Sequence, residues 1–232
     1  MKLQAGYLYD FVSLIFPDLC QACRVNLVNG EELLCTDCRY NLPFTNFHQK
    51  PDNIVAQQFW GRINVEAAYA LCYFIKGGKM QHLMHQFKYK GVQKIGHLLG
   101  NIAGDQLVQN PLFNSIDIII PVPLHKSRQK QRGYNQSTCF AEGISEKLNK
   151  PVVVNNLVRE RATATQTQRT RFLRFENMQE VFRVIDAQHL KNKHVLLVDD
   201  IITTGSTLEA CGAELLKIQG LKLSIATIAY AE

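Results

Sequence analysis

Apolar positions along the chain fall into two patterns, continuous runs and helical periods, and the two alternate. Five largely apolar runs are predicted as strands, over residues 65–75, 116–120, 151–158, 194–198 and 223–231. Runs without polar alternation indicate strands that are buried on both faces, as in a parallel sheet. Pro121 and Pro123 follow the second run and end it, because proline cannot donate to a central ladder.

Between these runs, apolar residues recur with the 3.6-residue period of an amphipathic helix. The periods predict four helices, around residues 80–87, 95–107, 140–148 and 208–218. Asn135 or Ser137 can cap the third helix, and Gly220 ends the fourth. Strands that alternate with helices predict an α/β fold, a mostly parallel sheet flanked by helices, over residues 65–232.

The region before the sheet divides into two parts, a cysteine-rich segment over residues 1–45 and a polar connector over residues 46–64. Four cysteines form two CxxC pairs in the first part: Cys20, Cys23, Cys35 and Cys38. Paired CxxC knuckles present four thiolates to one tetrahedral ion, which suits structural Zn²⁺. Two redox CxxC motifs or two disulfides are the alternatives, and in a cytosolic chain zinc is favoured over both. We therefore predict a small N-terminal zinc-binding domain of the zinc-finger type.

Other cysteines and histidines carry weaker signals. Cys72, Cys139 and Cys211 are isolated in apolar surroundings and are predicted as small buried side chains. His82 and His85 lie three residues apart on a polar helix face. A metal pair is conceivable there, but solvated or packing histidines are favoured.

Length and composition narrow the class of protein. A chain of 232 residues with 46% hydrophobic residues is globular, and it fits one α/β domain with a smaller appendage. No apolar run approaches the length of a membrane span, so no membrane insertion is expected. The apolar patch at residues 11–16 lacks a small-residue cleavage site, and we therefore expect a cytoplasmic protein.

The net charge of +6 suggests an anionic ligand, although solubility alone explains such an excess about as often. Its distribution is more informative, because the basic residues gather in two segments without an apolar period. The first segment holds Lys126, Arg128, Lys130 and Arg132, and the second holds Arg159, Arg161, Arg169, Arg171 and Arg174.

The chemistry is expected at the carboxyl ends of the strands, where open parallel sheets bind ligands. The run 194–198 leads directly into Asp199 and Asp200, and the turn Thr203-Thr204-Gly205-Ser206-Thr207 follows. This turn has the small residue, the hydroxyls and the new helix of a phosphate cradle, but it matches neither GxxxxGK[ST] nor GxGxxG. Two acids beside a bound phosphate would repel it unless a sugar diol lay between them. The pattern thus predicts a site for a ribose 5-phosphate group, to which Mg²⁺ could also bind.

The stretch VLLVDDIITTGST resembles the phosphoribosyl diphosphate (PRPP) signature of type I phosphoribosyltransferases. The resemblance implies that Asp199 and Asp200 contact the ribose hydroxyls and that Thr203, Thr204, Gly205, Ser206 and Thr207 hold the 5-phosphate. It also implies that the loop after IIIPVP faces the pyrophosphate, with Arg128 and Arg132 as its partners. Purine-salvage members carry an acid at the position of Thr203, and its absence here argues against a hypoxanthine or guanine acceptor.

A narrower resemblance covers nearly the whole chain. The four cysteines, FKYKG, PVPLHKSRQKQRGYNQ, RATATQTQRTRFLRFENMQEVF and the PRPP loop follow one another as in ComF-like proteins, the competence protein F and GntX-like family. This family is linked to natural transformation, so the resemblance implies DNA uptake, single-stranded DNA in the cytoplasm and other competence proteins as partners. It leaves the acceptor of the phosphoribosyl site unspecified.

Two functions are therefore compatible with the sequence. In the first, an Mg²⁺-dependent phosphoribosyltransferase uses Arg128, Arg132 and Arg161 to stabilise the departing pyrophosphate of PRPP. In the second, the fold binds a phosphorylated metabolite or single-stranded DNA through the basic segments, with Tyr134, Phe172 and Phe175 stacking on bases. Nothing in the residues assigns a catalytic group.

Overall fold

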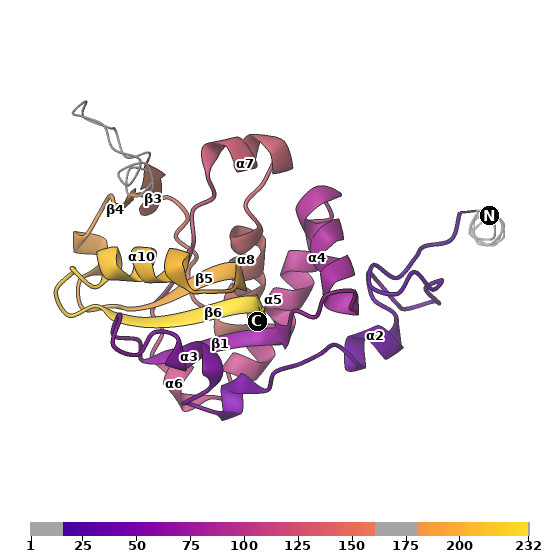
Figure 1. Cartoon of the computed structure of the whole chain (residues 1–232), viewed down its shortest axis with the longest axis horizontal. Helices are drawn as coiled ribbons and strands as arrows, with labels where there is room; N and C mark the ends of the chain where they lie inside the picture. The colour runs from indigo at the N-terminus through magenta and orange to yellow at the C-terminus, as the bar shows by residue number, and fades with distance from the viewer. Residues whose placement is uncertain (1–15, 161–180, 232) are drawn as a thin grey trace, which may run out of the picture.

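A parallel sheet forms the centre of the computed structural model, which describes residues 16–160 and 181–231 (Figure 1). Four strands lie side by side in the order β1-β6-β5-β2: β1 (Ala67–Tyr73), β6 (Lys222–Tyr230), β5 (His194–Ile202) and β2 (Ile118–Pro121). All three pairings are parallel. Residues 195–198 of β5 are fully buried, as the continuous apolar run predicts. The predicted fold class, a mostly parallel sheet flanked by helices, is confirmed.

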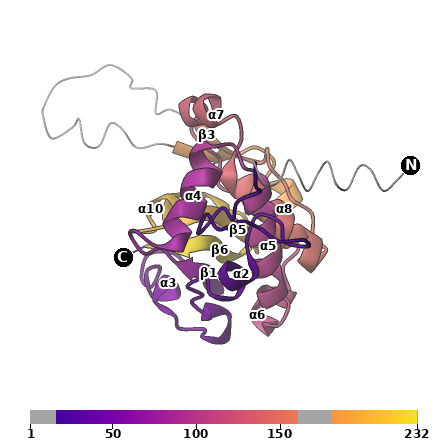
Figure 2. The same ribbon diagram turned by 90° about the vertical axis from the view of Figure 1, so that its right-hand side faces the viewer.

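Helices cover both faces of the sheet, so that in Figure 2 the strands lie between α10 and the pair formed by α5 and α8. The longer helices are α4 (Lys79–Tyr89), α5 (Lys94–Leu107), α8 (Gln136–Leu148) and α10 (Ser206–Leu215). The short ones are α2 (Thr36–Tyr40), η1 (Phe47–Gln49), α3 (Ile54–Gln57), α6 (Pro111–Asn114), α7 (Lys126–Arg132) and η2 (Gln188–Leu190). Glycines at positions 96, 100 and 143 let α5 and α8 approach closely, because a Cβ on any of them would meet the facing helix at under 3 Å. All four predicted helices are confirmed.

Two strand predictions need correction. The run 151–158 is not a strand of the sheet, since only Val152 bridges to Ile119. Instead β3 (Leu157–Glu160) pairs antiparallel with β4 (Val181–Val184) in a separate ribbon. Where the chain leaves the sheet, the side chain of Asn156 holds the start of the ribbon: it donates to the Asp186 carbonyl (2.9 Å) and accepts from the Asp186 amide (2.6 Å).

The strand predicted to end at residue 198 continues to Ile202 and so includes both acids. Pairing explains the extension. On one side β2 stops at Pro121, opposite Val198, whereas on the other side β6 stays paired as far as Tyr230, opposite Ile202. Asp199 and Asp200 therefore lie on a strand that has lost one neighbour.

The segment before β1 packs along the sheet. Phe44 forms an antiparallel bridge with Cys72, supported by hydrogen bonds from Thr45 N to Leu71 O (3.1 Å) and from Tyr73 N to Pro43 O (2.8 Å). Beyond it, the side chain of Asn53 caps α3 and donates to Ala68 O at 2.8 Å. The end of the cysteine-rich segment and the predicted connector thus lie along the β1 side of the sheet.

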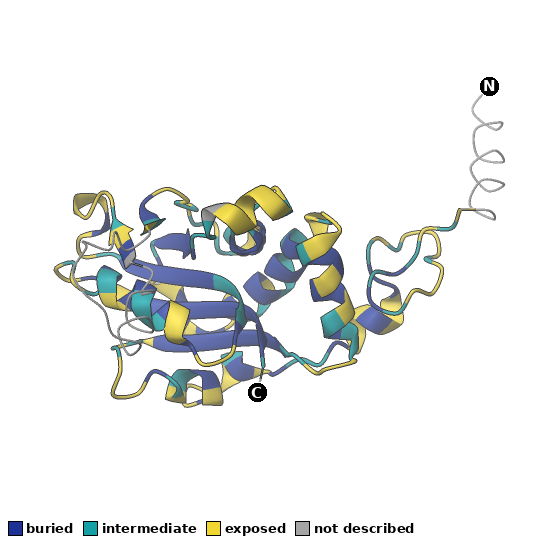
Figure 3. Ribbon diagram, turned by 45° about the horizontal axis from the view of Figure 1, so that its top comes forward, coloured by how far each residue is buried: buried dark blue, intermediate teal, exposed yellow. Residues whose placement is uncertain are grey.

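The three isolated cysteines, Cys72, Cys139 and Cys211, are buried in the core as predicted. Buried residues follow the strands and the inner faces of the helices, and exposed ones gather on loops and on α7 (Figure 3). Among the helices that the structure describes, none is long and apolar enough to cross a membrane.

Candidate functional site

A cavity of about 490 Å³ opens at the carboxyl ends of the strands. It is bounded by the ends of β1, β2, β5 and β6 and by side chains from α4, α7, α8 and β3. Its polar and charged lining residues are Lys88, Arg128, Arg132, Gln136, Ser137, Arg159, Asp199, Asp200, Thr203 and Thr207. The cavity therefore unites the acid pair with one arginine pair predicted from the sequence.

Asp199 sits at the floor of this cavity in a network of hydrogen bonds. Its Oδ1 accepts from the Ser137 hydroxyl (2.9 Å) and from the Asp200 amide (2.8 Å). Burial, and after it the negative charge of Asp200, raise the pKa of the Asp199 carboxyl to about 7. The charged form of Asp199 is thus poorly stabilised by the protein alone.

Asp200 is held by a cation from another part of the fold. Lys88, in the last turn of α4, lies with its Nζ 2.8 Å from Oδ2 of Asp200, and both side chains are more than four-fifths buried. Lys88 belongs to the FKYKG motif, to which the sequence reading attached no role. In the sequence, Lys88 is recognisable only as a lysine next to the last apolar position of the predicted helix. The fold is needed to show that its side chain reaches the acid pair.

The turn after β5 is the segment that the sequence predicts to hold a phosphate. Gly205 has φ +74° and forms the N-cap of α10, a conformation that a side chain would strain. The hydroxyls of Thr204 and Ser206 lie 2.9 Å apart. Thr203 and Thr207 line the cavity, whereas Thr204, Gly205 and Ser206 form the turn itself.

Three arginines face the acids across the cavity. Arg132, on α7, donates to Oε1 of Gln136 (2.8 Å) and lies 5.5 Å above the ring of Tyr89. Burial, and after it the charge of Arg128, lower the pKa of the Arg159 guanidinium. Arg128 and Arg159 therefore repel each other, and an anion between them would relieve the repulsion. Arg161, the third predicted pyrophosphate partner, lies outside the described residues.

Comparisons with known proteins find similar sequences along most of the chain. The family described as "Phosphoribosyl transferase domain" matches residues 135–232, which include α8, β5, the turn and α10. "DNA utilization protein YhgH" of Shigella flexneri is 29% identical over 226 residues, covering 88% of this chain and 93% of that protein. "Competence protein F" of Haemophilus influenzae is 27% identical over 210 residues, covering 86% of this chain and 91% of that protein.

Along most of its length the chain is similar to proteins named for competence and for DNA utilization. A further relative, "Competence protein ComFC" of Bacillus subtilis, is 27% identical over 92 residues, covering 39% of this chain and 35% of that protein. Among solved structures, purine phosphoribosyltransferase from Pyrococcus horikoshii Ot3 has a TM-score of 0.38, at 20% identity over 58% of this chain and 73% of that chain.

The four N-terminal cysteines gather in a second cluster, away from the cavity. The Sγ atoms of Cys20, Cys23, Cys35 and Cys38 all lie within 4.8 Å of one another, and none of the seven cysteines forms a disulfide. Burial opposes ionisation of Cys20, yet hydrogen bonds from backbone amides outweigh it and lower the pKa of this thiol to about 6. Four thiols with one already acidic are compatible with a structural zinc ion.

Three other side chains singled out from the sequence are engaged in contacts within the fold. His82 approaches the cysteine cluster with its Nδ1 3.2 Å from Ala22 O, and His85 packs on Tyr89 at 5.3 Å between ring centroids. Tyr134 packs its ring on Phe87 and donates its hydroxyl to the Phe87 carbonyl. Its ring therefore joins α4 to the loop before α8. Phe172 and Phe175, the other predicted stacking residues, fall outside the described ranges.

Proposed function

We propose that the chain binds Mg²⁺·PRPP, or a related ribose 5-phosphate, in the cavity at the carboxyl ends of the strands. Asp199 and Asp200 accept hydrogen bonds from the ribose hydroxyls, and Thr203, Thr204, Gly205, Ser206 and Thr207 hold the 5-phosphate at the start of α10. The observation that carries the proposal is the convergence of this acid pair, this turn and the cations Lys88, Arg128, Arg132 and Arg159 on one cavity.

The charges of the cavity favour such a ligand. Four cations face two acids, and the Asp199 carboxyl is only weakly stabilised as an anion. A sugar diol donates hydrogen bonds to the charged carboxylates, while phosphate groups neutralise the arginines. A ligand that carries both a diol and phosphate groups fits both requirements at once.

Turnover would use the same contacts. In a phosphoribosyl transfer, the bond from the anomeric carbon to pyrophosphate breaks, a nucleophilic atom of the acceptor bonds to that carbon, and pyrophosphate leaves with the bonding electrons. Mg²⁺ bound with PRPP supplies positive charge to the leaving group. Arg128, Arg132 and Arg159 are placed to do the same from the protein, and Arg161 is a further proposed partner.

We infer that the cellular role is the handling of imported single-stranded DNA in the cytoplasm during natural transformation. The printed names of the relatives, which refer to DNA utilization and competence, support this role. Helix α7 supports it physically, because Arg128 and Lys130 are exposed on an element at the margin of the molecule (Figures 1 and 3). The alternative is a phosphoribosyltransferase of nucleotide or cofactor metabolism without a role in DNA. The absence of an acid at Thr203 argues against purine acceptors in either case.

Titration with Mg²⁺·PRPP tests the ligand. Trp60 is the sole tryptophan and lies between Gln58 and Arg62, whose side chains donate to the carbonyls of Thr203 and Thr204, so its fluorescence can report binding alongside calorimetry. We expect saturable binding that the double substitution Asp199→Ala with Asp200→Ala abolishes. Saturable binding of equal affinity in wild type and the double variant would contradict the proposal.

The DNA role is tested with an oligo(dT) single strand at several salt concentrations. We expect affinity to fall with salt, and Arg128→Ala with Arg132→Ala to weaken it about tenfold or more and to flatten the salt slope. The matched control removes Lys191 and Lys222, two exposed cations at the amino ends of β5 and β6. Equal losses in both double variants would mean non-specific charge attraction and would support the metabolic alternative.

We also infer that the cysteine cluster holds one structural zinc ion. Metal analysis of the purified protein is expected to give about one zinc per chain, and Cys38→Ser to lower it. A metal-free protein with a normal unfolding transition would contradict this inference.

A further inference from the structure

Residues 58–62 of the connector contact the outer side of the turn that follows β5. Nε2 of Gln58 donates to Thr203 O at 2.9 Å, and Nη1 of Arg62 donates to Thr204 O at 3.1 Å. These are long-range contacts, about 140 residues apart along the chain. Two consecutive carbonyls of the turn are thereby held toward the connector.

The same segment also packs against Gly205. A Cβ built on this glycine would lie 3.2 Å from the ring of Phe59, a fully buried residue, and 3.3 Å from Oε1 of Gln58. Successive carbonyl and amide groups of a tight turn point to different sides. Fixing the carbonyls of Thr203 and Thr204 on the connector side leaves the following amides free for the cavity side.

Arg62 has a second partner that bears on anion binding. Its Nη2 forms an ion pair with Glu209, which lies in the first turn of α10. A carboxylate in the first turn of a helix is attracted to the same positive end that would hold a phosphate. Without a partner, Glu209 would therefore repel a phosphate bound at the start of α10. Arg62 neutralises this acid while it holds the turn.

We propose that Arg62, assisted by Gln58, is a positioning residue of the phosphate site, so that the connector belongs to that site. Arg62 does not line the cavity and acts through Thr204 and Glu209. The inference rests on the proposed ribose 5-phosphate ligand and adds that recognition of the 5-phosphate depends on the segment before the sheet.

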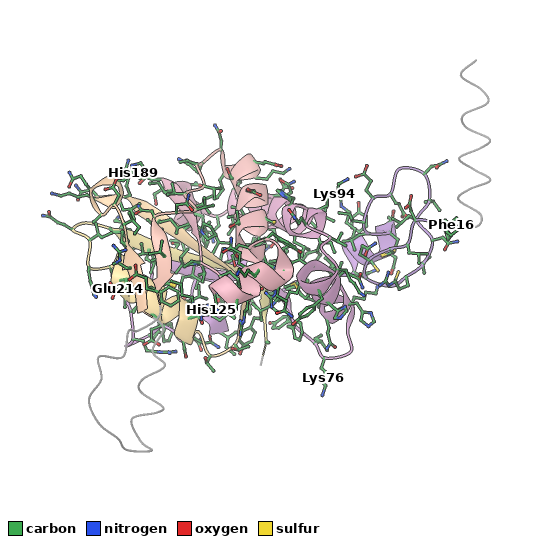
Figure 4. The ribbon with its side chains drawn as sticks, turned by 90° about the horizontal axis from the view of Figure 1, so that it is seen from above. Phe16, Lys76, Lys94, His125, His189 and Glu214 are labelled. Atoms are coloured by element: carbon green, nitrogen blue, oxygen red, sulfur yellow. The ribbon has the colours of Figure 1, made fainter. Side chains whose placement is uncertain are left out.

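The test compares four variants with three probes. Arg62→Ala removes both the contact with the turn and the charge, and Arg62→Lys keeps only the charge. Arg62→Ala with Glu209→Gln removes the acid left unpaired. Lys217→Ala is the matched control, because Lys217 pairs with Glu214 on the distal end of the α10 region (Glu214 is labelled in Figure 4). The probes are Mg²⁺·PRPP, ribose 5-phosphate and pyrophosphate, which has no 5-phosphate.

Arg62→Ala is expected to weaken the binding of PRPP and ribose 5-phosphate about tenfold and to leave pyrophosphate binding unchanged. Adding Glu209→Gln should recover part of the loss, and Lys217→Ala should change nothing. A general loss of structure would weaken all three probes together and would not be rescued by Glu209→Gln.

Outcomes separate this inference from the proposed function. Wild-type protein that binds none of the probes overturns both. Wild-type binding with Arg62→Ala equal to Lys217→Ala overturns the positioning role alone. If Arg62→Ala does not fold, Arg62→Lys decides the matter. It keeps the charge that pairs with Glu209, and it is expected to lose several-fold affinity for PRPP and ribose 5-phosphate but not for pyrophosphate.

Discussion

The two ends of β5 both bury polar side chains, but only one end leaves them in need of a ligand. At the amino end, the imidazole of His194 lies between two hydroxyls, with Nδ1 2.8 Å from Ser115 Oγ and Nε2 2.9 Å from Ser224 Oγ. At the carboxyl end, Asp199 and Asp200 repel each other beside an open cavity. The first end is satisfied within the protein, and under the proposed function a ligand completes the second.

This difference has a thermodynamic meaning. A buried polar group with partners stabilises the fold, whereas a buried charge without enough partners destabilises it. Under the proposed function, the polar groups at the carboxyl end serve binding, whereas those at the amino end serve folding. The following predictions test that separation, from the largest expected effect to the smallest.

Substitution Asp199→Asn removes a charge at the carboxyl end while it keeps the shape of the side chain. We expect affinity for Mg²⁺·PRPP to fall about a hundredfold, since charged hydrogen bonds to the ribose are lost. We also expect the free energy of unfolding at pH 8 to rise by on the order of 1 kcal/mol, since the buried charge is gone. Calorimetric titration and urea unfolding measure the two quantities. A variant that is less stable and still binds would reverse the assignment of this end.

Substitution His194→Ala acts on the opposite end of the same strand. It leaves the hydroxyls of Ser115 and Ser224 without their imidazole partner, and we expect a loss of about 2 kcal/mol in the free energy of unfolding. Affinity for Mg²⁺·PRPP, measured per folded molecule, should not change. A selective loss of affinity without a loss of stability would show that the amino end also serves binding.

Titration of His194 at the amino end and of Asp199 at the carboxyl end should change the free energy of unfolding with pH in opposite directions. Burial lowers the pKa of His194, so the unfolded chain binds its proton more readily, and this contribution to stability is lost as pH falls below about 6.5. The pKa of Asp199 is raised to about 7, so the folded state keeps its proton longer, and this contribution is lost as pH rises from about 4 to 7.

Urea unfolding at pH 5 to 8 checks these slopes in single variants. His194→Ala should remove the rise near pH 6, and Asp199→Asn should remove the decline toward pH 7. A wild-type and a His194→Ala profile of the same shape would contradict the assignment for the amino end, and an Asp199→Asn profile of unchanged shape would do so for the carboxyl end.

Much of this organisation could be predicted from local sequence. The apolar runs predicted β1, β2, β5 and β6, and the acid pair with its turn predicted one wall of the cavity. Both signals are local, because burial on two faces and a tight glycine turn each leave a mark within about ten residues.

The remaining parts of the site depend on contacts between distant segments. Lys88 lies on a helix more than 100 residues before Asp200, and Arg159 reaches the cavity from a ribbon that was predicted as part of the sheet. The sequence predicts the connector only as a polar link. No local sequence pattern indicates its hydrogen bonds to Thr203 and Thr204. Such pairings follow from the topology of the sheet, which cannot be derived from the local pattern of one sequence.

The bridge between Phe44 and Cys72 has a consequence for how the protein could be divided. Since β1 has β6 on only one side, residues 43–45 occupy the backbone groups of its open side. A fragment that starts at residue 65 would expose an unpaired, apolar edge strand, and such edges pair with one another between molecules. Such a fragment is expected to self-associate, so the cysteine-rich segment and the connector also keep the protein from aggregating.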